Sequence, residues 1–176
     1  MNIIHIDKEY ILGIGYDEVV ESVITAFKGY ISPGVIQPPR QELILDDPPR
    51  FFGSMPCYIK EYNVLSVKLI TYFFDNPRLY GKKPFNSIVI LFSGDDGEIL
   101  AYLDGDIITT LRTAGMTVAS TKYLSPRPPK KISLIGVGVQ GRMMAEMHLS
   151  IFDSIEEVKI FNRTFSKAVE YSRYIS

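Results

Sequence analysis

A glycine-rich segment between an apolar strand and a helical segment is the clearest chemical signal in this sequence. Gly136-Val137-Gly138-Val139-Gln140-Gly141 fits the pattern G-x-G-x-x-G. In such a segment Gly136 permits a tight turn, Gly138 lets the backbone approach a pyrophosphate, and Gly141 lets the helix pack against the strand. The alternative is a glycine-rich turn without function. The flanking strand and helix, and a second strand ending about 20 residues later, favour a dinucleotide site.

The end of that second strand bears on which nicotinamide cofactor is bound. It reads Phe161-Asn162-Arg163-Thr164 and contains no carboxylate, whereas NAD sites carry an Asp or Glu that accepts from the ribose hydroxyls and repels a 2′-phosphate. Arg163 offers a guanidinium group, and Asn162 and Thr164 offer hydrogen-bond donors. An ordinary solvated arginine is the alternative. We therefore predict that NADP(H) is favoured and that NAD(H) is possible.

Arg112 is a candidate anion ligand. We expect a long helix from about Thr109 to Leu124, which places Arg112 in its first turn, after Asp104-Gly105-Asp106. A cation there opposes the positive end of the helix dipole, and an anion bound between Arg112 and the free backbone donors would remove the conflict. The alternative is an ion pair of Arg112 with Asp104 or Asp106.

Two further cations stand in extended segments. Lys68 lies in a β-rich run, where alternation places it on one face with Ser66 and Ile70. A solvated lysine on the open face of an antiparallel sheet is the plain alternative. Arg40, which follows Gln37-Pro38-Pro39, is equally ambiguous by itself.

The elements that must position these residues predict an α/β protein in two parts. After a helix with Asp17 as its N-cap, residues 35–104 are expected to form a mostly antiparallel sheet, with Asp46-Asp47-Pro48-Pro49 turning the chain. Ser125-Pro126-Arg127-Pro128-Pro129 ends the long helix and is expected to separate a domain of residues 1–125 from one of residues 130–176. The β-α-β-α pattern of the second part predicts the first βαβ unit of a Rossmann-type parallel sheet.

Composition excludes several classes of protein. Hydrophobic residues make up 46% and charged residues 22%, and the net charge is -1, without the basic excess of a nucleic-acid binder. The longest apolar run, residues 88–92, is far shorter than the ~20 residues of a membrane span. The start lacks the features of a signal peptide, so a cytoplasmic location is expected. His5 and His148 have no metal-ligand spacing, so no metal site is expected.

Several segments together resemble the ornithine cyclodeaminase/mu-crystallin family. Beside the glycine turn and Asn162-Arg163-Thr164, they are Gln37-Pro38-Pro39-Arg40, Gly53-Ser54-Met55-Pro56, Lys68-Leu69-Ile70-Thr71-Tyr72, Leu103-Asp104-Gly105 and Ile108-Thr109-Thr110-Leu111-Arg112-Thr113-Ala114. The resemblance spans nearly the whole chain, and the Arg112-Thr113-Ala114 stretch with the glycine turn makes it specific. The Asn-Arg-Thr ending is closer to the NADP-using mu-crystallin branch than to ornithine cyclodeaminases, which typically carry Asp there.

This resemblance implies roles for the ambiguous residues. Arg40, Lys68 and Arg112 would hold the carboxylate of an amino-acid or imino-acid substrate, and Arg112, Thr113 and Gln140 would lie near the cofactor. A hydride would pass between the nicotinamide and the α-carbon, in reduction of a cyclic ketimine, in oxidative deamination or in cyclodeamination. Lys68 would serve proton transfer if its pKa is lowered. The resemblance also implies a homodimer formed through the sheet of the first domain.

The second part is short for a nucleotide domain, which usually contains two βαβαβ halves. Only residues 130–176 follow the expected linker, so the sequence is expected to be a truncated form, with the family's catalytic Asp beyond residue 176. A cofactor- and small-ligand-binding protein of the mu-crystallin type, without catalysis, is therefore the alternative function.

Overall fold

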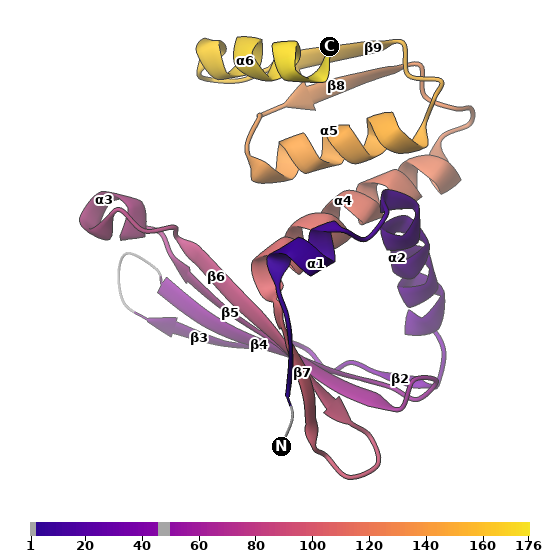
Figure 1. Cartoon of the computed structure of the whole chain (residues 1–176), viewed down its shortest axis with the longest axis vertical. Coiled ribbons are helices and arrows are strands. Elements are labelled where there is room, and N and C mark those ends of the chain that lie inside the picture. Colours follow the sequence, from indigo (N-terminus) through magenta and orange to yellow (C-terminus); the bar gives the residue numbers. More distant parts are fainter. Residues whose placement is uncertain (1–2, 46–49) are drawn as a thin grey trace. The chain divides into compact units, whose positions relative to one another are not determined.

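The computed structural model describes residues 3–45 and 50–176, and Figure 1 shows their arrangement. The turn expected at residues 46–49 lies outside the described residues. Packing divides the chain into two compact units, one made of the chain up to Gly13 with Phe27–Ile108, the other of Ile14–Ala26 with Thr109–Ser176. We describe each unit by itself. The expected division at residues 125–130 stays a prediction.

The first unit contains a sheet in which seven strands were identified among the described residues, in the order β1-β7-β6-β5-β4-β2, with β3 also paired to β4. The strands are β1 (Ile4–Ile6), β2 (Val35–Ile36), β3 (Gln41–Leu45), β4 (Arg50–Ile59), β5 (Val64–Phe73), β6 (Phe85–Ser93) and β7 (Ile99–Asp104). All pairs are antiparallel except β1 with β7. The mostly antiparallel sheet is thus confirmed. The parallel strand β1 was not expected, because three residues are too few to show a period.

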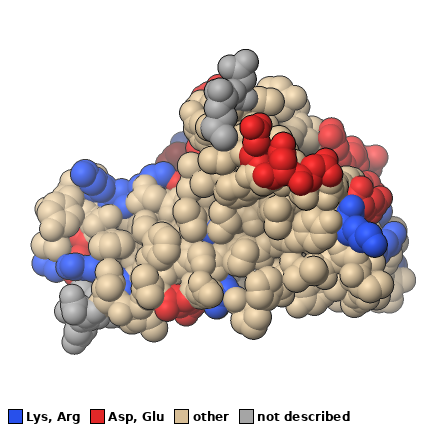
Figure 2. All heavy atoms as spheres, turned by 90° about the horizontal axis from the view of Figure 1, so that it is seen from below, with Lys and Arg blue, Asp and Glu red and all other residues tan. Residues whose placement is uncertain are grey.

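The register of the sheet defines two faces with different character. Lys68 pairs with Met55 and Val89, and these residues lie on what we call the inner face, with the buried Ile70. The opposite, outer face carries apolar side chains that remain partly exposed, namely Leu43, Phe52, Leu65, Ile88 and Tyr102. Figure 2 shows the molecule from below relative to the view of Figure 1. Residues other than Lys, Arg, Asp and Glu cover most of the side that faces the reader.

The first helix begins at a polar residue that satisfies one of its free N–H groups. In α1 (Lys8–Leu12), the side chain of Asp7 accepts from the N–H of Tyr10 at 2.9 Å. The prediction that Asp17 is an N-cap was wrong, because α2 (Tyr16–Tyr30) begins one residue earlier and contains Asp17 in its first turn. The carboxylate is favourable there too, because it faces the positive end of the helix dipole. A short helix, α3 (Asn76–Tyr80), follows β5.

The second unit contains the predicted β-α-β-α order. Its elements are β8 (Lys131–Ile135), α5 (Val139–Ile151), β9 (Glu157–Phe161) and α6 (Phe165–Ile175). β8 and β9 pair in parallel, as the sequence predicted. Their covered face forms a core in which Val137, Ala145 and Tyr171 are buried and Leu134, Ile160 and Ile175 pack against them. The other face leaves Ile135 and Phe161 81% and 67% exposed.

Helix α4 (Gly105–Leu124) begins in the first unit and continues into the second. In the second unit it packs against α2, and the two backbones approach so closely at Gly115 that an added side-chain carbon would lie 3.1 Å from Val23. An ion pair of Lys122 with Glu21 at 2.9 Å also joins the two helices. None of the described helices is long and apolar enough to cross a membrane.

Candidate functional site

The glycine turn connects β8 to α5 and is hydrogen-bonded to the end of the neighbouring strand β9. Gly136 follows β8 with a φ of 95°, a conformation that is strained for every other residue type. Its N–H donates to the carbonyl of Phe161, the last residue of β9, at 2.8 Å. The motif therefore lies in the strand–turn–helix setting that a dinucleotide site requires.

The other two glycines of the motif meet very different surroundings. A side-chain carbon at Gly141 would lie 2.1 Å from the carbonyl oxygen of Gly136 and 3.3 Å from Leu134, so packing of helix against strand requires glycine there. At Gly138 nothing lies within 4 Å of such a carbon, and its φ of -72° suits any residue. The protein itself thus does not require glycine at position 138, and the open space above this backbone fits an approaching pyrophosphate.

The start of α5 offers donors without competing acids. Gly138 is its N-cap and has no side chain to bond the first N–H groups, and no acidic residue stands in the first turn. Such a helix start favours a bound anion. Gln140 Oε1 is buried and has no hydrogen-bond partner among the described residues. A buried acceptor without a partner is costly, so a ligand that carries a hydroxyl or amide donor would satisfy it. With the open space at Gly138 and the free donors at the start of α5, the residues present fit a dinucleotide.

Asn162 ties the turn to the segment after β9. Its Oδ1 accepts from the N–H of Val137 at 3.2 Å, and its Nδ2 donates to the carbonyl of Thr164 at 2.8 Å. Thr164 is the N-cap of α6, without a side-chain hydrogen bond to the helix. Arg163 between them is exposed. Both the oxygen and the nitrogen of the Asn162 side chain form hydrogen bonds within the protein. Arg163 is the charged side chain of this segment, and it is available to solvent.

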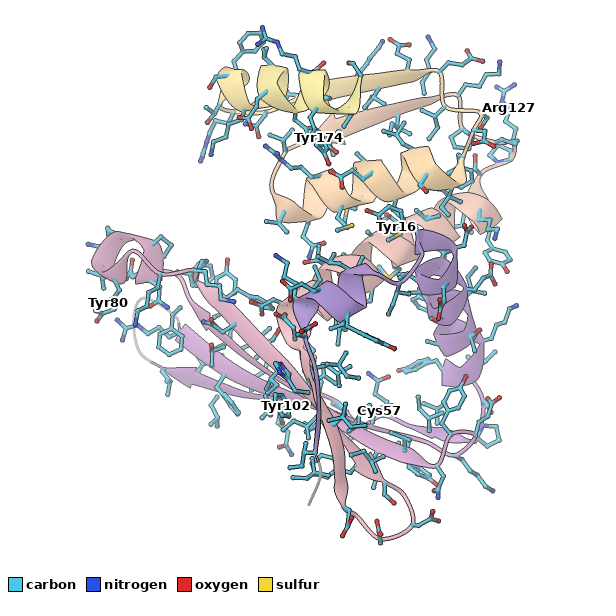
Figure 3. All side chains as sticks on the ribbon, viewed as in Figure 1. Tyr16, Cys57, Tyr80, Tyr102, Arg127 and Tyr174 are labelled. Atoms are coloured by element: carbon cyan, nitrogen blue, oxygen red, sulfur yellow. The ribbon has the colours of Figure 1, made fainter. Side chains whose placement is uncertain are left out.

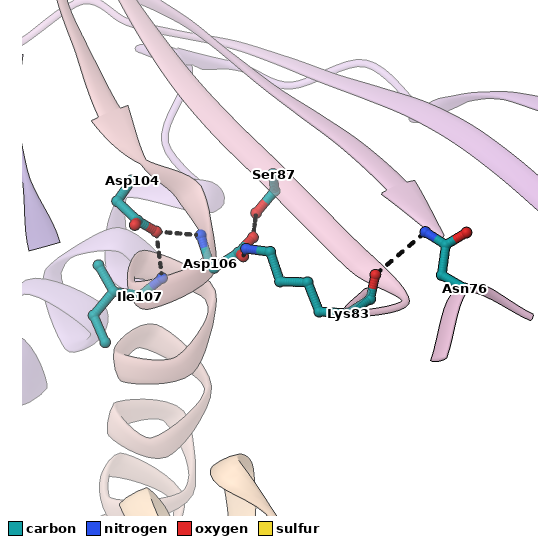
Figure 4. Close-up of polar contacts among 6 residues, drawn as sticks. All are labelled: Asn76, Lys83, Ser87, Asp104, Asp106 and Ile107. Carbon is teal, nitrogen blue, oxygen red and sulfur yellow. Dashed lines mark hydrogen bonds and ion pairs between the residues drawn. The ribbon is translucent and has the colours of Figure 1, made fainter. Parts of the chain in front are cut away.

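The expectation that Arg112 lies in the first turn of its helix was wrong. Helix α4 begins at Gly105, four residues before Thr109, which places Arg112 about two turns inside it at 3.6 residues per turn. The N-terminus is capped by Asp104, whose Oδ1 accepts from the N–H groups of Asp106 and Ile107 at 2.9 and 3.0 Å (Figure 4). Arg112 therefore does not oppose the positive end of the helix dipole, and no bound anion is needed there to offset it.

The carboxylate of Asp106 is also committed, to partners on β6 and the loop before it. Ser87 donates to Asp106 Oδ1 at 2.9 Å, and Lys83 forms an ion pair with Oδ2 (Figure 4). Arg112 is exposed, and the structure shows it in no ion pair with the described acidic residues. The hydroxyl of Thr113 donates back to the carbonyl of Thr109 at 2.6 Å, within the helix.

Lys68 and Arg40 lie close in the register of the first unit. Lys68 is partly buried on the inner face, with its ammonium group 6.0 Å from the ring centroid of Phe85. Arg40 directly precedes Gln41, the residue paired with Ser54 next to Met55, and Met55 pairs with Lys68 across the sheet. Arg40 is exposed, and its Nε forms an ion pair with Glu42 at 2.8 Å. The shared role of these two cations and Arg112 in binding a carboxylate stays a prediction, since Arg112 belongs to the other unit.

Two residues of the second unit contact the turn or its helix and were not expected to do so. Arg142 Nε donates to the carbonyl of Val137 at 3.0 Å, and the guanidinium group lies 5.0 Å from the ring centroid of Tyr171. Burial and the neighbouring Glu146 raise the pKa of Tyr171 well above its ordinary value. Arg142 directly follows the last glycine of the motif, and this position was the only signal available.

Other chemistry finds no support in the described residues. Cys57, labelled in Figure 3, lies in β4, and burial raises the pKa of its thiol, which disfavours a reactive thiolate. No group of three or more His, Cys, Asp or Glu residues that could hold a metal ion was found in the described part of the chain.

Comparisons with known sequences show the family of the chain. The sequence pattern of the ornithine cyclodeaminase/mu-crystallin family matches residues 6–176. A Delta(1)-pyrroline-2-carboxylate reductase of Bacillus cereus is 33% identical over 162 residues, which are 92% of this chain and 49% of the relative. A ketimine reductase mu-crystallin of Macropus fuliginosus is 30% identical over 159 residues, 89% of this chain and 49% of that protein. The chain thus spans about half the length of the curated relatives it matches.

Solved structures show the same fold. The structure of a Thermococcus litoralis Delta(1)-pyrroline-2-carboxylate reductase in complex with NADH and L-proline has a TM-score of 0.88 at 24% identity. The match covers 99% of this chain and 54% of the reductase chain. An archaeal alanine dehydrogenase dimer with bound NAD has a TM-score of 0.85 at 26% identity and is covered over 53% of its length.

Proposed function

The chain belongs to the ornithine cyclodeaminase/mu-crystallin family, and from that premise we propose that it supplies the substrate-binding part and the first cofactor-binding unit of a nicotinamide-dependent oxidoreductase of amino or imino acids. The observation that carries the proposal is the glycine turn. Gly136 and Gly141 are required by the protein's own geometry, whereas Gly138 leaves open space above its backbone. Open space at that point suits a pyrophosphate.

Each predicted residue has a distinct task in this function. The backbone at Gly138 and the start of α5 hold the pyrophosphate, and Gln140 Oε1 accepts from a hydroxyl or amide N–H of another part of the cofactor. Arg40, Lys68 and Arg112 orient the substrate carboxylate, and Lys68 adds positive charge and a proton-transfer group. When bound, the cofactor exchanges a hydride with the α-carbon. Catalysis by this chain's own residues is then largely orientation.

NADP(H) is the preferred cofactor in this proposal. Arg163 is exposed at the end of β9, and no carboxylate stands in the segment 161–164 to repel a 2′-phosphate. One N–H of the Asn162 amide donates to the carbonyl of Thr164, and its second N–H, with the Thr164 hydroxyl, is proposed to donate to the cofactor beside Arg163. Structures of similar fold contain NAD or NADH, so NAD(H) is the alternative.

Imine reduction or alanine-type oxidative deamination is favoured over cyclodeamination, because the strand end resembles the NADP-using branch. The test follows the absorbance of NADPH and NADH in a full-length enzyme with cyclic imino acids and with pyruvate plus ammonia, and measures proline formed from ornithine. We expect turnover in one of the first two assays. Absence of turnover in all three would overturn the enzymatic function. If the 176-residue chain itself binds cofactor but does not oxidise NADPH with any imine substrate, the alternative is supported for this chain, a protein that binds cofactor and small ligands.

A homodimer formed through the outer face of the sheet is part of the proposal. Leu43, Phe52, Leu65, Ile88 and Tyr102 expose between 36% and 62% of their surface on one face of the sheet. An exposed apolar face of this kind marks an interface. A cytoplasmic location likewise stays a prediction from composition.

A further inference from the structure

Val137, the middle residue of the Gly-Val-Gly turn, is held by two side chains from opposite sides. Its N–H donates to Asn162 Oδ1 at 3.2 Å, and its carbonyl accepts from Arg142 Nε at 3.0 Å. Its own side chain is 5% exposed within the core of the unit. Backbone on both sides of Val137 is therefore fixed before any ligand arrives.

Arg142 is itself held by α6. Its guanidinium group lies over the ring of Tyr171, 5.0 Å from the centroid, and a terminal nitrogen lies 3.9 Å from Glu170. The Tyr171 hydroxyl donates to the carbonyl of Arg142 at 3.1 Å and lies 3.4 Å from Glu146. Tyr171 is fully buried, so the platform beneath Arg142 is rigid.

The carbonyl of Val137 belongs to the same peptide group as the N–H of Gly138, because the peptide unit is planar. A hydrogen bond that fixes this carbonyl also fixes the direction of that N–H, which stands at the start of α5 beside the open space. A donor aimed in advance binds its ligand more tightly than one that must be ordered on binding.

We propose that Arg142 is a positioning residue for phosphate binding, acting through the Val137 carbonyl. The proposal rests on the dinucleotide site of the proposed function and adds that Arg142 works at the pyrophosphate, which NAD(H) and NADP(H) share. Arg163, by contrast, is assigned to the 2′-phosphate alone.

Two substitutions separate the hydrogen bond from the charge. Arg142→Met fills similar space with no donor, whereas Arg142→Gln places an amide nitrogen where Nε stands, and both remove the positive charge. Binding of adenosine and of ADP to the whole chain is measured by calorimetry, with thermal unfolding as the check on folding. We expect Arg142→Met to weaken ADP binding on the order of tenfold, as for loss of about 1.4 kcal/mol. Arg142→Gln should bind ADP nearly as wild type, and adenosine affinity should be the same in all three proteins.

The outcomes are distinct. Wild-type ADP affinity in Arg142→Met overturns the inference, as does an equal loss in both variants, because the charge would then act directly. An equal loss for adenosine and ADP means that Arg142 only supports the fold. If Arg142→Met does not fold, Arg142→Lys replaces it, because a methylene stands where Nε was, and the same loss is expected. A wild-type chain that binds neither ADP nor NADPH overturns the proposed function itself.

Discussion

A side-chain carbon at Gly141 would lie 2.1 Å from the carbonyl oxygen of Gly136, whereas one at Gly138, in the same turn, would meet nothing within 4 Å. The motif therefore contains two glycines that the fold needs, Gly136 and Gly141, and one, Gly138, that the fold itself does not require. Gly141→Ala should lower the free energy of unfolding by about 1–3 kcal/mol, because helix and strand must separate to admit the methyl group.

Gly138→Ala is the matched substitution. The φ of -72° at position 138 is ordinary for alanine, so the midpoint of thermal unfolding should stay close to that of the wild type. The added methyl group occupies the space proposed for the pyrophosphate. We expect a large loss of NADPH and ADP binding, measured by cofactor fluorescence and calorimetry. Unchanged binding in Gly138→Ala would place the dinucleotide elsewhere.

Arg163 should decide cofactor preference. A charge-assisted contact to a phosphate contributes about 1.5–3 kcal/mol, or roughly tenfold to hundredfold in affinity. Arg163→Ala is thus expected to weaken NADPH binding by that factor and to leave NADH binding nearly unchanged, in titrations of both cofactors. Arg173→Ala, at the far end of α6, is the control and should change neither. Equal losses for both cofactors would show that Arg163 has a structural role.

The outer face of the sheet should mediate dimer formation. Leu65 is 40% exposed on this face and pairs with Tyr58 and Phe92. A charge there would have to be buried in the interface at high cost. Leu65→Glu should therefore convert the dimer to a monomer in light scattering at micromolar concentration. Leu124→Glu, at an 82% exposed site at the end of α4, should leave the dimer intact. A wild-type monomer would contradict this prediction.

The cap of α4 should contribute measurably to stability. Asp104 accepts from two N–H groups at the start of the helix, and loss of such a cap costs about 1 kcal/mol. Asp104→Ala should lower the midpoint of thermal unfolding accordingly, whereas Asp104→Asn, which keeps the accepting oxygen, should recover most of the loss. Equal midpoints for wild type and Asp104→Ala would show that the helix does not depend on this cap.

The sequence alone determined the features that are local. Glycines at positions 136, 138 and 141 between a β-rich run and a helical run predicted the dinucleotide turn, because turn, strand and helix each leave a short-range pattern. Alternation in residues 64–74 predicted a strand and placed Lys68 beside Ser66 and Ile70 on one face. The same local information misplaced the start of α4. Asp104 and Asp106 were considered as ion-pair partners of Arg112, whereas Asp104 caps the helix and Asp106 is held by Ser87 and Lys83, which are distant in sequence.

Only the tertiary structure decided the contacts between residues that are far apart in the chain. Strand register made Lys68 a neighbour of Met55 and Val89, and a shift by one residue would have turned its side chain to the outer face. Asn162 was expected to donate to the cofactor, and the structure adds that its amide also forms hydrogen bonds with Val137 and Thr164. The position of Arg142 directly after Gly141 was the only signal of its contacts in the sequence, because the contact with Tyr171 depends on how α6 packs against α5. Such packing follows from burial of the whole core, which no short segment encodes.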